Sequence, residues 1–370
     1  MAEGIPIRVC YVLAYRDPEY VRTRTLIAAL ESLGHIQLTT VINTQRGVRR
    51  YGEVLRMLVK QRRQKPDVYI LGFRGHELYW LVRMIAAGRP IIFDAFLSPS
   101  DVLQSEAKHG RSGQLLGHIV APMERAILRN ASAVLVDTQN HAELFSERFR
   151  VAAELITALP VGAYPVPDVD RAVENPDSPL QVLFYGSVLP LHGLSVVFAA
   201  LERLENVALR LRTIGGTAES IEQLRGSLVH GPKMEIAHSE WVPLPDIIAS
   251  EIPAADLCLG GPFGGTPQAL RVVTGKTYQF LAGCRATVVG RTPDHELLGF
   301  ADRYNCLIVD QDDPQQLADT IRWADENRDE LPEIGMRGRE LFDRSFTVEA
   351  IATALEPVLG RFGPAERTGP

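Results

Sequence analysis

The sequence lacks several features that mark common protein classes. It has no GxGxxG segment after its first apolar run, so the fingerprint of a nicotinamide-dependent dehydrogenase is absent. It has no block of basic residues, and its formal net charge of −6 argues against a nucleic-acid-binding protein. No apolar run approaches the ~18 residues of a membrane span, and the N-terminus has no signal pattern. We therefore expect a cytoplasmic protein with at most peripheral membrane contact.

Cysteine is also scarce, with four residues in a chain of 370. Cys10, Cys258, Cys284 and Cys306 lie far apart and form no CxxC pair. Three of them lie in or beside apolar runs, which is typical of small buried side chains in a reducing compartment. The length exceeds that of one ordinary core, so two domains are expected.

Short pairs of arginine are the densest positive charge in the first half of the chain. They occur at residues 49–50 and 62–63, on segments with helical spacing. We interpret them as solvated helix faces; the alternative is a patch that contacts a membrane or an acceptor.

What the sequence does contain is a regular alternation of apolar runs and helical spacing. In the first half, strands are predicted over 7–14, 35–42, 67–71, 90–93 and 133–137, and helices over 21–33, 54–64, 78–87, 112–130 and 138–148. A proline-rich stretch over 160–179 interrupts the pattern. In the second half, strands are predicted over 181–185, 209–214, 256–259, 286–289 and 307–309, an extended stretch over 235–242, and helices over 194–204, 244–248, 276–282, 314–327 and 348–362.

This alternation predicts an α/β protein with two doubly wound parallel sheets. We expect Rossmann-like domains over 1–165 and 180–345, followed by a C-terminal helical segment over 346–370. Ligands of parallel sheets bind beyond the carboxyl ends of the strands, so both domains are expected to present strand-end loops to one central cleft.

A glycine-rich stretch over 259–283 is the most informative segment. A strand runs into a loop that contains Gly264, Gly265 and Thr266, and a helix start follows at Lys276. Such a loop is expected to expose backbone N–H groups that cradle a phosphate, with Arg271 and Lys276 supplying positive charge. The alternative is an ordinary β-to-α turn with surface cations.

Several segments resemble family 4 glycosyltransferases of the GT-B fold, in particular one bacterial branch of that family. The resemblance rests on FYGS (184–187) with PLHG (190–193), LGGPFGGTP (259–267), KTYQFLAG (276–283), DAFLS (94–98) and VDT (136–138). It covers essentially the whole chain.

The resemblance implies transfer of a sugar from a nucleoside diphosphate sugar, with retention at the anomeric carbon and no tightly bound metal. UDP or GDP is the expected nucleotide, and a glycan, lipid-linked sugar or small natural product is the expected acceptor. The C-terminal domain would bind the donor and the N-terminal domain the acceptor. The last helix would cross back to the N-terminal domain. The leaving phosphate can accept the proton of the acceptor hydroxyl, so no enzymic nucleophile is expected.

The sequence departs from the family at four positions. Ser187 stands where an arginine is common, His192 where a lysine is common, and Arg271 and Gln279 where two glutamates are usual. Arg271 and Lys276 are therefore the groups expected to neutralise the diphosphate.

The other donor-side candidates are given with their alternatives. His192 can be a protonated phosphate ligand or a neutral histidine at a helix start. Gln279 can bind the ribose or lie on an exposed helix face. Candidates near the diphosphate, base and ribose also include Gly186, Gly215, Val242 and Thr277.

On the acceptor side, Asp94 directly follows an apolar strand, so its carboxylate is expected at the mouth of the cleft, where it would orient or deprotonate the acceptor. Ser98 and Asp101 are weaker candidates of the same kind, and a helix cap or turn is the alternative for a loop aspartate. His76 and Arg22 are candidate acceptor contacts; the alternatives are a packed histidine and a solvated arginine.

Two other functions use the same architecture. A non-hydrolysing nucleotide-sugar epimerase would need carboxylate and histidine groups around the sugar, and few are available. A catalytically degenerate binding or scaffolding subunit would explain the departures from the family pattern.

Overall fold

The computed structural model describes residues 6–105, 110–163, 166, 178–205, 207–226 and 234–363. The chain divides into two compact units. The N-terminal unit comprises Met1–Gly162 together with Val348–Pro370, and the C-terminal unit comprises Ala163–Thr347. Most of the predicted linker over 160–179 lies outside the described residues.

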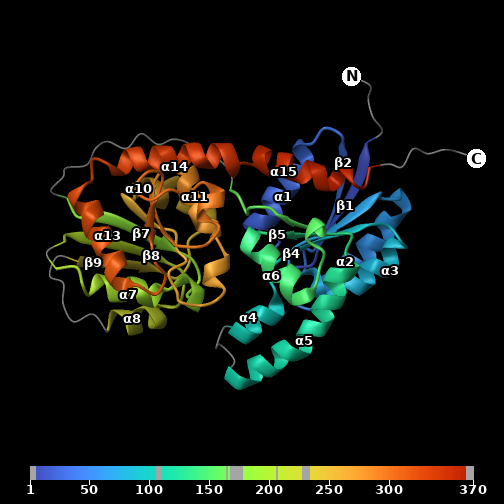
Figure 1. Ribbon diagram of the computed structural model, residues 1–370, viewed down its shortest axis with the longest axis horizontal. Coiled ribbons are helices and arrows are strands. Elements are labelled where there is room, and N and C mark those ends of the chain that lie inside the picture. The colour runs from blue at the N-terminus through green and yellow to red at the C-terminus, as the bar shows by residue number, and fades with distance from the viewer. Residues whose placement is uncertain are drawn as a thin grey trace, which may run out of the picture. The chain divides into compact units, whose positions relative to one another are not determined.

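The N-terminal unit alternates strands and helices (Figure 1). Its strands are β1 (Ile7–Leu13), β2 (Ile36–Ile42), β3 (Val68–Leu71), β4 (Ile91–Phe96), β5 (Ala133–Val136) and β6 (Ile156–Ala158). Its helices are α1 (Val21–Ser32), α2 (Arg49–Gln61), η1 (Arg62–Gln64), η2 (Gly75–Glu77), α3 (Tyr79–Ala86), α4 (Pro99–Ser105), α5 (Gly110–Asn130), α6 (Gln139–Phe149), η4 (Ala153–Leu155) and α15 (Val348–Gly360). The C-terminal helix α15 packs against α1.

The C-terminal unit repeats this alternation. Its strands are β7 (Leu180–Tyr185), β8 (Leu209–Ile214), β9 (Met234–Ser239), β10 (Leu257–Leu259), β11 (Ala286–Gly290) and β12 (Leu307–Val309). Its helices are η5 (Pro190–His192), α7 (Leu194–Leu201), α8 (Ala218–Arg225), α9 (Leu244–Asp246), η6 (Ile247–Glu251), α10 (Ile252–Ala254), η7 (Ala269–Arg271), α11 (Gly275–Ala282), α12 (His295–Leu298), α13 (Pro314–Glu326) and α14 (Leu331–Ser345).

Each unit is built on one six-stranded parallel sheet. The strand orders are β2-β1-β3-β4-β5-β6 and β12-β11-β10-β7-β8-β9. The inner strands of each sheet are covered on both faces, as in β1 and β10, where almost every residue is buried. The predicted fold class of two doubly wound α/β domains is therefore confirmed.

Two local differences from the predicted elements matter for function. Strand β4 continues to Phe96, three residues beyond the predicted end, because it pairs with β5 through an irregular register at Asp94 and Phe96. Helix α14, which was not predicted, packs against α11 and helps to bury it.

Candidate functional site: the strand ends after β7 and β10

The strand order reverses once in the C-terminal sheet, between the neighbouring strands β7 and β10. Strands β8 and β9 lie on one side of this point and β11 and β12 on the other. In doubly wound sheets, the crevice at such a switch point is the usual ligand site. The segments that follow β7 and β10 are the glycine-containing loops singled out from the sequence.

Glycines let these loops approach one another closely. A Cβ on Gly215 (φ 105°) would lie 2.3 Å from the carbonyl oxygen of Gly186. A Cβ on Gly193 (φ 64°) would lie 2.4 Å from the amide nitrogen of Gly264, and one on Gly264 would lie 1.9 Å from the Pro190 carbonyl oxygen. The atoms that such a Cβ would meet belong to the main chain, which cannot turn aside as a flexible side chain can, so the close packing requires glycine.

Lys276 is the central side chain of this region. It lies in the first turn of α11, is 94% buried, and its Nζ is 4.0 Å from the centroid of the Phe184 ring. Within the described residues, Nζ has no hydrogen-bond partner. Burial lowers the pKa of Lys276 to about 7. A buried ammonium group without a counter-ion is costly, so its retention points to an anionic ligand.

Gly186, the first residue after β7, lies beside Lys276. A Cβ at this glycine (φ 137°) would lie 3.7 Å from Lys276 Nζ and 3.6 Å from the His192 ring. The structure therefore brings Gly186, His192 and Lys276 together, as the sequence predicted for the donor side. The main chain leaves this space open because position 186 carries no side chain.

The His192 ring is held in one orientation. Its Nδ1 lies 2.6 Å from the Ser187 carbonyl oxygen, which can only accept, so Nδ1 carries the proton. Burial and the nearby Lys276 lower the pKa of His192 to about 3. Of the two alternatives, these features favour the neutral histidine, and a phosphate-binding role for His192 stays a prediction.

Gln279 follows Lys276 by three residues and therefore lies on the same face of α11. Its side chain is buried, and Nε2 has no hydrogen-bond partner among the described residues. The alternative of an exposed helix face is wrong. Gln268, a buried residue of the loop before α11, also leaves Oε1 without a partner in the described chain.

Three glycines of the loop do not offer their backbone N–H groups to the expected phosphate cradle. The N–H groups of Gly260 and Gly261 both donate to the Val288 carbonyl, at 2.8 and 3.1 Å. The N–H of Gly264 donates to the Leu191 carbonyl at 3.0 Å. Neighbouring segments thus satisfy these three donors. The start of α11 has no side-chain cap, so among the described residues the N–H groups of Gly275 and Lys276 stay available to a ligand.

The remaining predicted donor residues lie in different surroundings. Ser187 and Gly265 are exposed, and Val242 packs beside a buried cluster at the end of β9. The hydroxyls of Thr266 and Thr277 serve the fold: the first accepts from the Ala269 N–H at 3.2 Å, and the second is 3.0 Å from the Thr274 hydroxyl. Arg271 is half-buried at the end of η7.

In the N-terminal unit, Asp94 does not lie open at a strand end. It is completely buried, and Arg22 Nη2 lies 2.9 Å from its Oδ1. Arg22 is also buried, and it donates to the carbonyls of Leu159 and Pro160. The expectation of an accessible carboxylate failed because β4 runs past Asp94. The alternative of a solvated Arg22 is also wrong.

The other three predicted acceptor residues have local structural partners. Ser98 Oγ accepts from the Asp101 N–H at 3.1 Å and so caps α4, while the Asp101 carboxylate pairs with Arg148 at 3.1 Å. His76 stacks edge-on against Phe93 with centroids 4.8 Å apart, and burial and Arg74 lower its pKa to about 3. These contacts match the structural alternatives, and an acceptor role for the three residues stays a prediction.

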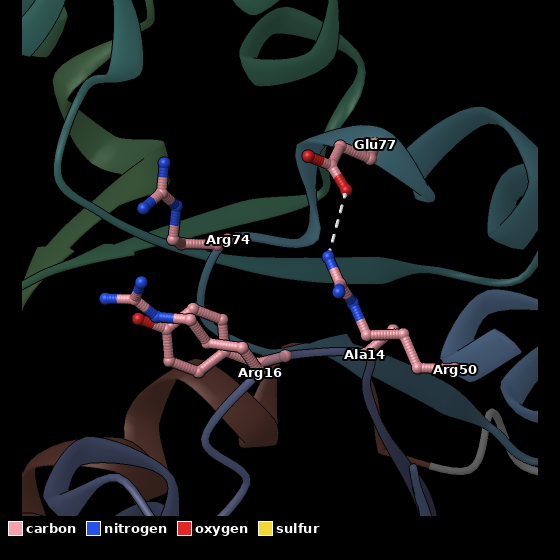
Figure 2. A pocket seen from close by; sticks show the side chains of 6 residues that line it. Ala14, Arg16, Arg50, Arg74 and Glu77 are labelled. Carbon is pink, nitrogen blue, oxygen red and sulfur yellow. Dashed lines mark ion pairs between the residues drawn. The ribbon is translucent and has the colours of Figure 1, made fainter. Parts of the chain in front are cut away.

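A pocket of about 230 Å³ in the N-terminal unit was not predicted as a site (Figure 2). Its lining residues are Ala14, Tyr15, Arg16, Arg50, Arg74 and Glu77. The sequence offered one signal, since the loops after two apolar strands each carry an arginine. The prediction named His76 as an acceptor contact and left out Arg74, two residues earlier.

Two features are absent from the described residues. No group of three or more His, Cys, Asp or Glu side chains in these residues is arranged to hold a metal ion. In the same residues, no helix combines the length and the apolar character needed to span a membrane.

Comparisons with known proteins agree with this architecture. Residues 10–162 match the model of a glycosyl transferase 4-like domain. No curated protein sequence matches the chain.

Among solved structures, the chain is similar to HepE from Anabaena in complex with UDP and glucose, with 15% identity, a TM-score of 0.64, and coverage of 96% of this chain and 100% of that one. Sucrose-phosphate synthase from Thermosynechococcus elongatus matches with 16% identity, a TM-score of 0.70, and coverage of 96% and 98%. A glycosyltransferase from Rickettsia africae matches with 10% identity, a TM-score of 0.65, and coverage of 96% and 98%.

At such low identities the structural matches establish the fold, and the domain model adds the family of the N-terminal unit. The resemblance inferred from the sequence is thereby confirmed. Residues 10–162 therefore carry a glycosyl transferase 4-like domain, and the chain as a whole has the two-domain GT-B fold.

Proposed function

We propose that this protein transfers a sugar from a nucleoside diphosphate sugar to an acceptor hydroxyl, with retention at the anomeric carbon and without a tightly bound metal. The observation that carries the proposal is the buried, unpartnered ammonium group of Lys276 at the switch point of the C-terminal sheet. UDP is the first candidate nucleotide, because HepE, which has the same fold, binds UDP and UDP-glucose.

Lys276 would act on the diphosphate. Cleavage of the bond between the sugar and the phosphate leaves developing negative charge on the leaving oxygen. A protonated Lys276 in a site that excludes water stabilises this charge strongly, and the start of α11 adds the positive end of a helix dipole. Since burial lowers its pKa to about 7, Lys276 would take up a proton as the diphosphate binds.

The reaction needs no enzymic base. The bond from the anomeric carbon to the phosphate oxygen breaks, and the acceptor oxygen bonds to that carbon on the same face. The hydroxyl proton passes to the leaving phosphate oxygen, so atoms and charge balance. The burial of Asp94 against Arg22 is compatible with this scheme.

The neighbouring residues would have supporting roles. Gln279, on the Lys276 face of α11, would hydrogen-bond the ribose, and Arg271 would provide a second charge for the diphosphate. Gly186 and Gly215 would give the nucleotide close access to the main chain. The N-terminal unit would bind the acceptor.

Calorimetric titration with UDP tests the donor site. Lys276→Met keeps an apolar stem against Phe184 but removes the charge. We expect it to weaken UDP binding by more than about tenfold, or roughly 1.4 kcal/mol. Lys60→Met, the same change at an exposed position on α2, should bind UDP as the wild type does.

The same titration with GDP, ADP and dTDP identifies the base. Unchanged UDP affinity in Lys276→Met would overturn the site assignment. Binding of a nucleotide sugar without turnover over a panel of acceptors would favour the degenerate subunit that the departures at Ser187 and His192 suggest.

A further inference from the structure

The pocket in the N-terminal unit lies at that unit's own switch point. The order of the first sheet reverses between β1 and β3, which pair directly. Ala14, Tyr15 and Arg16 follow β1, and Arg74 follows β3. The pocket thus occupies the place at which a doubly wound sheet usually binds its ligand.

The pocket is strongly positive. Three guanidinium groups and one carboxylate line it, which leaves a formal charge of +2. Among the described residues, the one ion pair of Glu77 is with Arg50, at 3.9 Å, which is too long for a hydrogen bond. Within the described chain, neither Arg16 nor Arg74 forms an ion pair. In Figure 2 their guanidinium groups lie on the same side of the pocket, away from the Arg50–Glu77 pair.

The loops that carry these arginines are held in place. The Tyr15 N–H donates to Asn43 Oδ1 and the Asn43 amide donates to the Tyr15 carbonyl, both at 2.9 Å. The Tyr15 ring meets the buried Phe73 ring edge-on at 4.9 Å, which ties the loop after β1 to the loop after β3. The pocket is therefore preorganised.

Arg74 adopts an unfavourable backbone conformation. Its φ of 58° and ψ of 27° lie in the left-handed region, where the Cβ of a residue crowds the following carbonyl oxygen. A glycine would be less costly at this position. Such conformations at non-glycine residues concentrate at functional sites, because the side chain is needed there.

Arg50 has donor capacity left over. Its guanidinium stacks on Tyr51 at 4.4 Å and donates to the Gly47 carbonyl at 3.1 Å, but its buried Nε has no partner in the described chain. It also lies in the first turn of α2, where a cation opposes the helix dipole. An anion in the pocket would accept a hydrogen bond from this Nε and would offset the unfavourable interaction with the helix dipole.

We infer that this pocket binds a phosphate group of the acceptor, so that the substrate of the transferase is a phosphorylated molecule. A phosphate monoester carries a charge between −1.5 and −2 at neutral pH, which matches the formal charge of the pocket. Planar guanidinium groups bind phosphate through paired hydrogen bonds. This inference rests on the proposed function, since it names the class of the acceptor.

The first test is calorimetric titration of the full chain with inorganic phosphate in the presence of saturating UDP. We expect Arg16→Gln/Arg74→Gln to weaken phosphate binding by at least about tenfold, because two of the three cations are lost. Both side chains are exposed and unpaired with carboxylates, so the variant should fold. Arg56→Gln, at an exposed arginine on α2, is the matched control and should bind phosphate normally.

The second test uses matched acceptors with and without a phosphate monoester. Transfer should favour the phosphorylated member of each pair. The double variant should raise its acceptor KM at least about tenfold, with the donor KM and kcat little changed. A water-soluble sugar phosphate and a phospholipid vesicle serve as separate probes, so that a soluble and a lipid source of the phosphate are distinguished.

The two proposals fail in different ways. Suppose that UDP binding requires Lys276 but that phosphate binding is unchanged in the Arg16→Gln/Arg74→Gln variant. The pocket inference is then overturned and the donor site stands. Equal transfer to phosphorylated and neutral acceptors also overturns it. If phosphate binding requires Arg16 and Arg74 but UDP does not bind, the donor site is the proposal that fails.

Discussion

Arg22 in the N-terminal unit and Lys276 in the C-terminal unit are both cations in almost fully buried positions. Arg22 is paired with Asp94 at 2.9 Å and donates further hydrogen bonds to backbone carbonyls. The Nζ of Lys276 lies over the face of Phe184 and has no hydrogen-bond partner in the described part of the chain. A buried charge with a full set of partners holds a fold together, whereas one without partners is available to a ligand.

This contrast also separates the two switch points. The carboxyl edge of β1 and β3 carries exposed arginines around a pocket, and the carboxyl edge of β7 and β10 carries one buried lysine among glycines. Exposed guanidinium groups suit a hydrated phosphate that is held by several contacts. A buried ammonium group suits a charge that develops during the reaction, because its field is less screened there.

Breaking the pair in the N-terminal unit should have the largest effect on stability. Asp94→Asn leaves Arg22 as an uncompensated buried charge, and we expect the free energy of unfolding of that unit to fall by about 3–5 kcal/mol. Urea denaturation followed by circular dichroism measures it. Lys276→Met should lose no stability by the same measurement, because it removes an unpaired charge. Equal losses in both variants would contradict the contrast.

The pH dependence of UDP binding sharpens the comparison at Lys276. The pKa of Lys276 without ligand is about 7, below its ordinary value, so above pH 7 the free protein loses the proton that the bound diphosphate requires. The Kd for UDP should therefore rise with pH above 7, by up to about tenfold per pH unit.

Below pH 7, Lys276 is already protonated and contributes no further change. His192, the other titratable group facing Gly186, stays neutral because burial and Lys276 lower its pKa to about 3. Calorimetry between pH 7 and 9 measures the trend. Lys276→Met should show no such rise, and an identical rise in that variant would assign the effect to another group.

Ser98 offers the smallest and most local test. Its hydroxyl caps α4, so Ser98→Ala should reduce the free energy of unfolding by about 1 kcal/mol. The acceptor KM should stay unchanged, which steady-state kinetics checks. A raised acceptor KM with unchanged stability would instead support the acceptor contact predicted from the sequence.

The sequence predicted well wherever neighbouring residues decide the outcome. Strand and helix periodicity located most elements, and the glycine loop followed by Lys276 marked the C-terminal site. The sequence predicted less well where a carbonyl of a distant strand accepts a hydrogen bond from the loop. The Gly260 and Gly261 N–H groups look unpaired in the sequence, yet they donate to Val288 on the neighbouring strand β11.

By itself, the sequence determined two doubly wound α/β units, because apolar runs and helical spacing are local patterns that hold wherever a residue packs. Only the tertiary structure decided which charges are paired. Arg22 and Asp94 are 72 residues apart, and Arg16, Arg50 and Arg74 come from three separate segments. Whether such groups neutralise one another or surround a pocket depends on the sheet order and on strand ends, and neither is a property of neighbouring residues.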